Sequence, residues 1–141
     1  MYNLHPLLSA FPPVLLSLSV ISEIVFLFKR NEQIRLFANQ LFVLCCLVTP
    51  LTYISGNYFA DQASKTFEVS EAAIVHHYDM AKLFLFSIIL NGLVFYATRN
   101  TKHYIYHLLF LSLNFMLLAY VGFLGGELVF SHGAGVSATI N

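Results

Sequence analysis

The distribution of basic residues is the strongest constraint on how this chain folds. Of its seven Lys and Arg residues, five fall in two short gaps between long apolar stretches. Lys29, Arg30 and Arg35 occupy the first gap, and Arg99 and Lys102 occupy the second. Short basic loops stay on the cytoplasmic side of a membrane, so both gaps should face the cytoplasm. The pattern predicts four membrane spans with both termini outside (N-out, C-out).

The composition agrees with a chain whose main solvent is lipid. It is 58% hydrophobic and 10% charged, whereas soluble domains carry about 25% charged residues. The formal net charge is zero, so no basic field exists to attract nucleic acid. Four helices of about 20 residues would use most of the chain. We therefore expect an all-α fold, a four-transmembrane-helix bundle forming a single integral membrane domain over residues 1–141.

The predicted spans cover residues 12–28, 36–54, 72–98 and 103–130. Pro12 and Pro13 suit the first turn of a helix, where the missing N–H groups are not needed. His5 then lies on a short approach segment or on a kinked extension of the first span.

The second span contains a proline near its end and is followed by a polar connection. Pro50 is expected to kink the helix, and residues 55–57 (Ser-Gly-Asn) are expected to end it. The connection 58–71 is where an extramembrane helix or lid could lie, and Ser70 is a plausible N-cap for the third span. Adjacent Cys45 and Cys46 lie inside the apolar run, which favours small packing residues over a disulfide or zinc site.

Histidines from distant parts of the chain should meet at one membrane face. The topology brings six polar side chains to the outer leaflet: His5, His76, His77, His132, Asp79 and Glu127. Imidazoles that converge from different segments at one depth are typical of b-type haem sites. Alternatively, these residues simply tolerate the headgroup region, as amphipathic side chains do.

Helical geometry favours one of the two adjacent histidines. At about 100° per residue, His76 falls within roughly 60° of Asn91 on the polar stripe of the third span, together with Met80 and Ser87. We expect this stripe to face the bundle, which makes His76 the first ligand candidate. His77 is then better placed for the interface or a neighbouring subunit.

Other polar residues have more than one interpretation. Asp79 could accept a hydrogen bond from His76 or pair with Lys82. On the fourth span one stripe contains His103, His107, Asn114, Leu118, Val121 and Gly125. A His pair four residues apart can bind a metal, but without a third ligand it is more often interfacial.

Glu23 is an acid inside the first span. A charge near the bilayer centre costs on the order of 3 kcal/mol, so this carboxyl should be protonated or paired. It could relay a proton or hydrogen-bond a quinone, or its side chain could extend toward Lys29. Gly122 and Gly126, spaced four apart, would let another helix approach closely.

Both ends of the chain carry motifs of a known family. The chain opens with HPLLSAFP at residues 5–12 and closes with GGELVFSHGAGV at residues 125–136. It resembles an uncharacterised family of four-helix bacterial inner-membrane proteins (a domain of unknown function), whose signatures are HPxxxxFP and GGxLVxxHGxGV. Members are suspected of binding haem in the manner of small dihaem b-type cytochromes.

The resemblance implies functional roles for His5, His132 and one of His76 and His77. Many members carry a second His where this chain has Ala10. If that residue is a ligand, the resemblance implies one cofactor fewer here, or none.

Our leading hypothesis is a membrane b-type cytochrome-like electron-transfer protein with haem b near the outer face. His5 or His132 would ligate the iron on one side and His76 on the other, with His77, Glu23 and Asp79 as further site residues. It would pass electrons between quinone and an external, periplasmic partner. Hydrolytic and phosphate-binding motifs are absent from the sequence, which favours an electron carrier or oxidoreductase subunit over a hydrolase or transferase.

Two alternatives stay open. The chain could be a non-catalytic accessory subunit of a larger respiratory or transport complex, packing through glycine and aromatic surfaces. A proton or metal-ion pathway through Glu23, Asn91 and Asn114 is the other.

Overall fold

The structure is a computed structural model that describes residues 5–66 and 70–131, with side chains in 5–60 and 70–131. Its helices are α1 (His5–Ser9), α2 (Phe11–Lys29), α3 (Glu32–Thr66), α4 (Glu71–Thr98) and α5 (Tyr104–Phe130). No strand occurs in these ranges. Four helical stretches are long and apolar enough to cross a membrane, the first combining α1 and α2. The all-helical, four-span prediction is confirmed.

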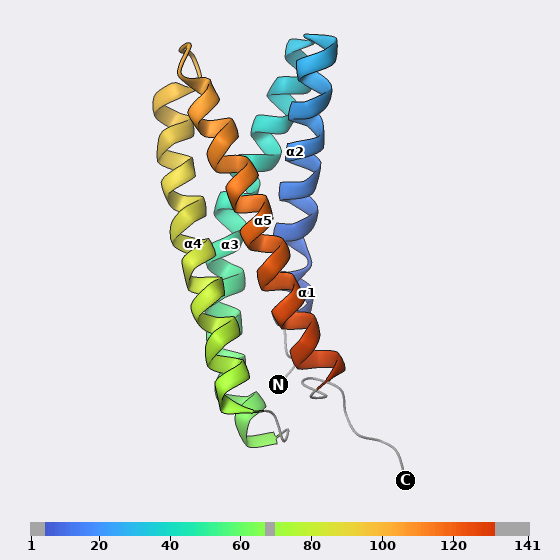
Figure 1. Ribbon diagram of the computed structural model, residues 1–141, viewed down its shortest axis with the longest axis vertical. Coiled ribbons are helices and arrows are strands. Elements are labelled where there is room, and N and C mark those ends of the chain that lie inside the picture. Colours follow the sequence, from blue (N-terminus) through green and yellow to red (C-terminus); the bar gives the residue numbers. More distant parts are fainter. Residues whose placement is uncertain (1–4, 67–69, 132–141) are drawn as a thin grey trace.

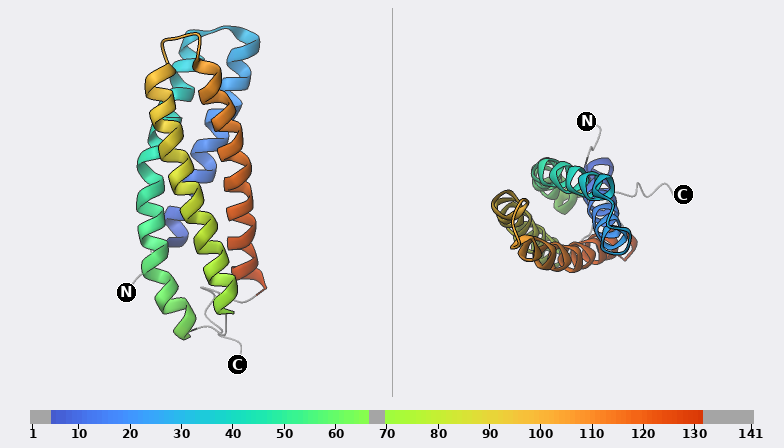
Figure 2. Two further views of the ribbon diagram at one scale, coloured as in Figure 1. Left: turned by 60° about the vertical axis from the view of Figure 1, so that its left-hand side comes forward. Right: turned by 90° about the horizontal axis from the view of Figure 1, so that it is seen from above.

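The helices form two antiparallel hairpins that pack lengthwise. α2 packs chiefly on α3 and α4 chiefly on α5, while contacts of α3 with α4 and of α2 with α5 join the hairpins. Figure 1 places the α2–α3 and α4–α5 connections at the top, and the start of α1 and the end of α5 at the bottom. Figure 2 shows the long helices side by side from a second direction. We call the top the turn end and the bottom the terminal end.

Local sequence signals account for most helix boundaries. Prolines occupy the first turn of α2, as predicted, and Ala10 separates α2 from α1 as its N-cap residue. Arg30 closes α2 in a left-handed conformation, φ 52°, and donates its backbone N–H to the Phe26 oxygen at 2.8 Å. α4 begins at Glu71 after Ser70, whose side chain makes no capping hydrogen bond.

One predicted boundary is wrong. α3 does not end at residues 55–57 but continues to Thr66 with Pro50 inside it. The Thr49 hydroxyl donates to the Cys45 carbonyl at 2.8 Å beside the proline. Gly56 has a packing role: a Cβ there would lie 2.7 Å from the His5 ring. The glycine admits a neighbouring side chain, and it does not stop the helix.

The core lies along the inward stripes of the four long helices. Leu16, Phe42, Cys45 and Ile88 are fully buried. Phe42 packs edge-on against Phe95, with ring centroids 5.5 Å apart. Cys45 is buried and Cys46 is half-buried, both as free thiols, in agreement with the predicted packing role. Large apolar side chains also cover the outer surface, as expected for helices that face lipid.

Replacing Phe42 with Ala should destabilise the bundle strongly, because the ring is fully buried between α4 and α5. Truncating a buried Phe typically costs about 3–5 kcal/mol. Phe86→Ala is the matched control, since that ring is 60% exposed. Thermal unfolding in detergent micelles should show a much lower midpoint for Phe42→Ala than for Phe86→Ala. Equal midpoints would contradict the assigned packing of α3.

Candidate functional site

A cavity of about 460 Å³ lies between the hairpins toward the terminal end. Its volume is within the range of about 300–1,000 Å³ that is usual for small-molecule sites. The lining comes from all five helices and is largely apolar, with several glycines and prolines. The polar side chains among the lining residues are His5, Ser9, Thr49, Thr52, Tyr53, Asn57, His77 and Tyr78.

His5 reaches this cavity from α1 and is held by α3. Its Nδ1 lies 3.1 Å from the Ser55 hydroxyl oxygen, and the Ser55 hydroxyl donates to the Thr52 carbonyl at 2.7 Å. Because a serine hydroxyl has one hydrogen, Ser55 must accept from His5 Nδ1–H. This contact ties the His5 ring to α3.

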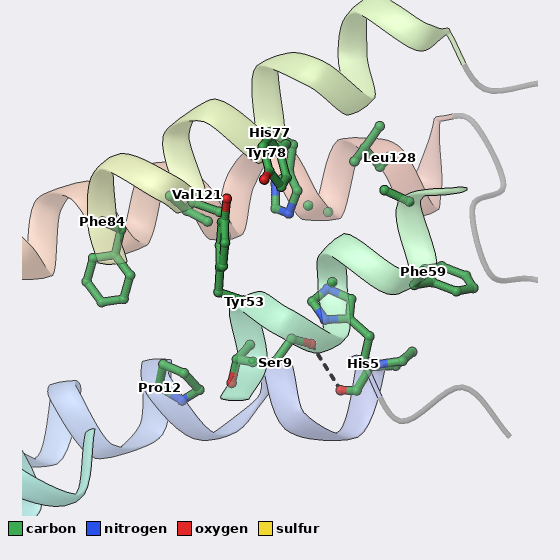
Figure 3. A pocket seen from close by; sticks show the side chains of 18 of the residues that line it. His5, Ser9, Pro12, Tyr53, Phe59, His77, Tyr78, Phe84, Val121 and Leu128 are labelled. Atoms are coloured by element: carbon green, nitrogen blue, oxygen red, sulfur yellow. Dashed lines mark hydrogen bonds between the residues drawn. The ribbon is translucent and has the colours of Figure 1, made fainter. Parts of the chain in front are cut away.

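His77 enters the cavity from α4, across from His5 (Figure 3). A Cβ at Gly125 of α5 would lie 3.2 Å from the His77 ring, so the glycine leaves just enough room for the imidazole. Within the described part of the chain, the buried His77 Nδ1 has no hydrogen-bond partner. The structure therefore places both imidazole rings at the same cavity.

The predicted orientation of the adjacent histidines is wrong. His76 is exposed, and its Nε2 lies 3.0 Å from the Tyr120 hydroxyl, outside the cavity. The inward stripe of α4 instead contains His77, Phe84 and Asn91, which are seven residues apart. A straight helix already places His77 about 40° from Asn91, against about 60° for His76, and the drift of about 20° per heptad in a supercoiled bundle brings His77 closer still.

Two other predicted site residues, Asp79 and Glu127, are not among the residues that line the cavity. Asp79 and Glu127 are exposed, and Asp79 makes neither of its predicted contacts, with His76 or with Lys82. His132 lies outside the described residues. Of the predicted terminal-end cluster, the structure brings together His5 and His77.

His107 of α5 and His103 at its N-cap contact different side chains and do not form a common metal site. His103 is exposed and stacks on Tyr106, with ring centroids 5.9 Å apart. His107 is buried, and its Nδ1 lies 2.9 Å from the Asn91 side-chain oxygen. Across residues 5–66 and 70–131, no group of three or more His, Cys, Asp or Glu residues could hold a metal ion.

Several site residues were not singled out from the sequence. The rings of Tyr53 and Tyr78 lie 5.3 Å apart in the cavity wall. Thr52 anchors α1, since its hydroxyl lies 3.2 Å from the Leu8 carbonyl oxygen. Thr52, Ser55 and Gly56 lie on the side of α3 that faces α1. The spacing of these three residues would have indicated this shared face if the helix had been predicted to continue past residue 57.

The chain belongs to the DUF2231 family of predicted membrane proteins. The family match extends over residues 1–138, almost the whole chain. No significant match was found among curated proteins or solved structures.

Adding a methyl group at Gly56 should displace His5, because the new Cβ would meet its ring at 2.7 Å. Overpacking of this kind costs about 1–3 kcal/mol, partly offset by the better helix propensity of Ala, worth about 1 kcal/mol. Gly122→Ala is the control, since its Cβ would have no heavy atom within 4 Å. We expect Gly56→Ala to unfold at a lower temperature than Gly122→Ala in thermal melts. The same midpoint for both variants would argue against the close seating of His5.

Proposed function

We propose that the cavity binds haem b between His5 and His77 and that the protein carries electrons within the membrane. The observation that carries this proposal is the approach of two imidazoles, from α1 and α4, to one largely apolar cavity. Two histidines on different helices are the usual axial ligands of a b-type haem in a membrane bundle.

The residues present fit such a group in three respects. His77 Nδ1 is buried without a partner in the described chain. Glycines sit beside each ring, Gly56 at His5 and Gly125 at His77. An apolar, aromatic wall suits the flat face of a porphyrin.

Each side chain then has a definable task. Ser55 orients the His5 ring and fixes its tautomer, as outer hydrogen bonds do for metal-ligating imidazoles. Tyr53, Tyr78 and Phe84 form flat walls that exclude water. Haem, when bound, would supply one-electron transfer. The tyrosine hydroxyls give the otherwise apolar wall two hydrogen-bonding groups.

We further propose that the protein lies in a bacterial inner membrane with the turn end in the cytoplasm. Lys29, Arg30, Arg35, Arg99 and Lys102 all belong to the turn end, which supports this orientation. The cavity would then lie toward the periplasmic leaflet. There it could exchange electrons with quinone in the bilayer and with an external protein.

Haem retention should depend on His77 and not on its neighbour His76. Of these two neighbours, His77 lines the cavity and His76 contacts Tyr120 at the surface. We expect His5→Ala and His77→Ala to lose most bound haem and His76→Ala to retain it. The measurements are a pyridine haemochrome assay, iron per protein, and the reduced α band after supplying haem during expression.

Two outcomes would overturn the proposal. The first is an iron-free, colourless preparation of the unmodified protein that does not take up haem on reconstitution. The second is haem binding that survives His77→Ala and His5→Ala together. Fixed co-purification with larger respiratory subunits, unaffected by these substitutions, would then favour the accessory-subunit alternative.

A further inference from the structure

A second polar site lies inside the bundle nearer the turn end, around Glu23. The Glu23 side chain is only 4% exposed, although it lies within a stretch long enough to span a membrane. It does not extend toward exposed Lys29. Instead, its Oε1 lies 2.7 Å from the Tyr104 hydroxyl of α5.

The same hydroxyl makes a second short contact. Tyr104 Oη also lies 2.7 Å from the side-chain oxygen of Asn39 on α3. A tyrosine hydroxyl has one hydrogen, so it can donate to only one of these two oxygens. The other contact needs a hydrogen from elsewhere, either from a protonated Glu23 or from the Asn39 amide group after the side chain turns over.

These two possibilities are two protonation states of one site. In the neutral state, the Glu23 carboxyl donates to Tyr104 Oη, and Tyr104 donates to the Asn39 oxygen. In the ionised state, Tyr104 donates to the Glu23 carboxylate, and the Asn39 amide group donates to Tyr104 Oη. Changing state requires only rotation of the Tyr104 hydroxyl and a half-turn of the Asn39 amide, which exchanges its oxygen and nitrogen, and the backbone can stay in place.

The charged surroundings leave both states accessible. From α3, the Arg35 guanidinium carbon lies 5.9 Å from the Tyr104 ring centroid, but Arg35 also pairs with Glu32 at 2.7 Å. From α5, the His107 ring lies 5.1 Å from Tyr104, with its Nδ1 directed to Asn91.

The charged residue that follows α4, Arg99, contacts a different aromatic ring. Arg99 stacks on exposed Tyr96, with its guanidinium carbon 5.1 Å from that ring's centroid. An ionised Glu23 would therefore have partial compensation from Arg35. Its second oxygen, Oε2, is buried with no partner among the described residues, which disfavours permanent ionisation because an unpaired buried charge is costly.

We propose that Glu23, Tyr104 and Asn39 form a reversible proton-binding site within the membrane. The proton that leaves the Glu23 carboxyl passes to water at the turn end, and Tyr104 keeps its own hydrogen in both states. The site takes up one proton and releases one, and no electron is transferred. This proposal does not depend on haem binding, because the site lies outside the cavity lining.

Infrared spectroscopy of the protein in lipid nanodiscs tests the assignment. We expect the carbonyl stretching band of a protonated carboxylic acid at neutral pH, shifted to lower frequency in D₂O. Alkaline titration should remove this band and acidification should restore it. Glu23→Gln should abolish the band, and Glu71→Gln, at an exposed residue of the terminal end, should leave it unchanged.

A second variant separates the proposed contact from a merely buried acid. Tyr104→Phe removes the hydroxyl that accepts from Glu23, so the acid band should persist but move to higher frequency. If Glu23→Gln fails to fold, this shift in Tyr104→Phe identifies the same carboxyl. An acid band that is the same in Tyr104→Phe, or a spectrum of folded Glu23→Gln identical to that of the unmodified protein at every pH, would overturn the proposal.

Discussion

The fold depends on one constraint, that lipid offers no hydrogen-bond partner, so polar groups in the spans must be satisfied inside the bundle. Two buried polar side chains obey it through hydrogen bonds that join different helices. Ser19 donates to the Ala38 carbonyl at 3.0 Å, linking α2 to α3. His107 donates to Asn91 at 2.9 Å, linking α5 to α4. These contacts fix which face of each helix turns inward, and the apolar faces are then left for lipid.

The same constraint explains why the fold could be predicted from sequence and the site only in part. Spans follow from the length of apolar runs and the position of charges, and both are explicit in the sequence. The rotation of a helix about its own axis is harder to predict, because a small error in the assumed number of residues per turn accumulates along the helix. Over the 14 positions from His77 to Asn91, a straight helix leaves His77 about 40° and His76 about 60° from Asn91, a small difference that the seven-residue repeat of a supercoil widens in favour of His77.

The glycines show a second limit of sequence reasoning. From sequence alone, Gly56 is expected to end a helix and Gly122 to form part of a helix-packing motif. In the structure Gly56 lies within α3 beside the His5 ring, and a Cβ at Gly122 would meet no heavy atom within 4 Å. A glycine in a span leaves space, and what fills that space is set by the neighbouring helix. His5 reaches the cavity because it begins α1 at the terminal end, a placement that follows from topology alone.

Side-chain volume divides the bundle into an open half and a closed half. Toward the terminal end, small residues such as Gly56 and Gly125 leave the cavity between the hairpins. Toward the turn end, the rings of Phe42 and Phe95 lie 4.6 and 4.9 Å from His107 and close the interior. An imidazole in the open half faces a space that a ligand can occupy, whereas His107 in the closed half is a packed core residue. The chemistry available to a histidine in this chain is therefore decided by the size of its neighbours across the helix interface.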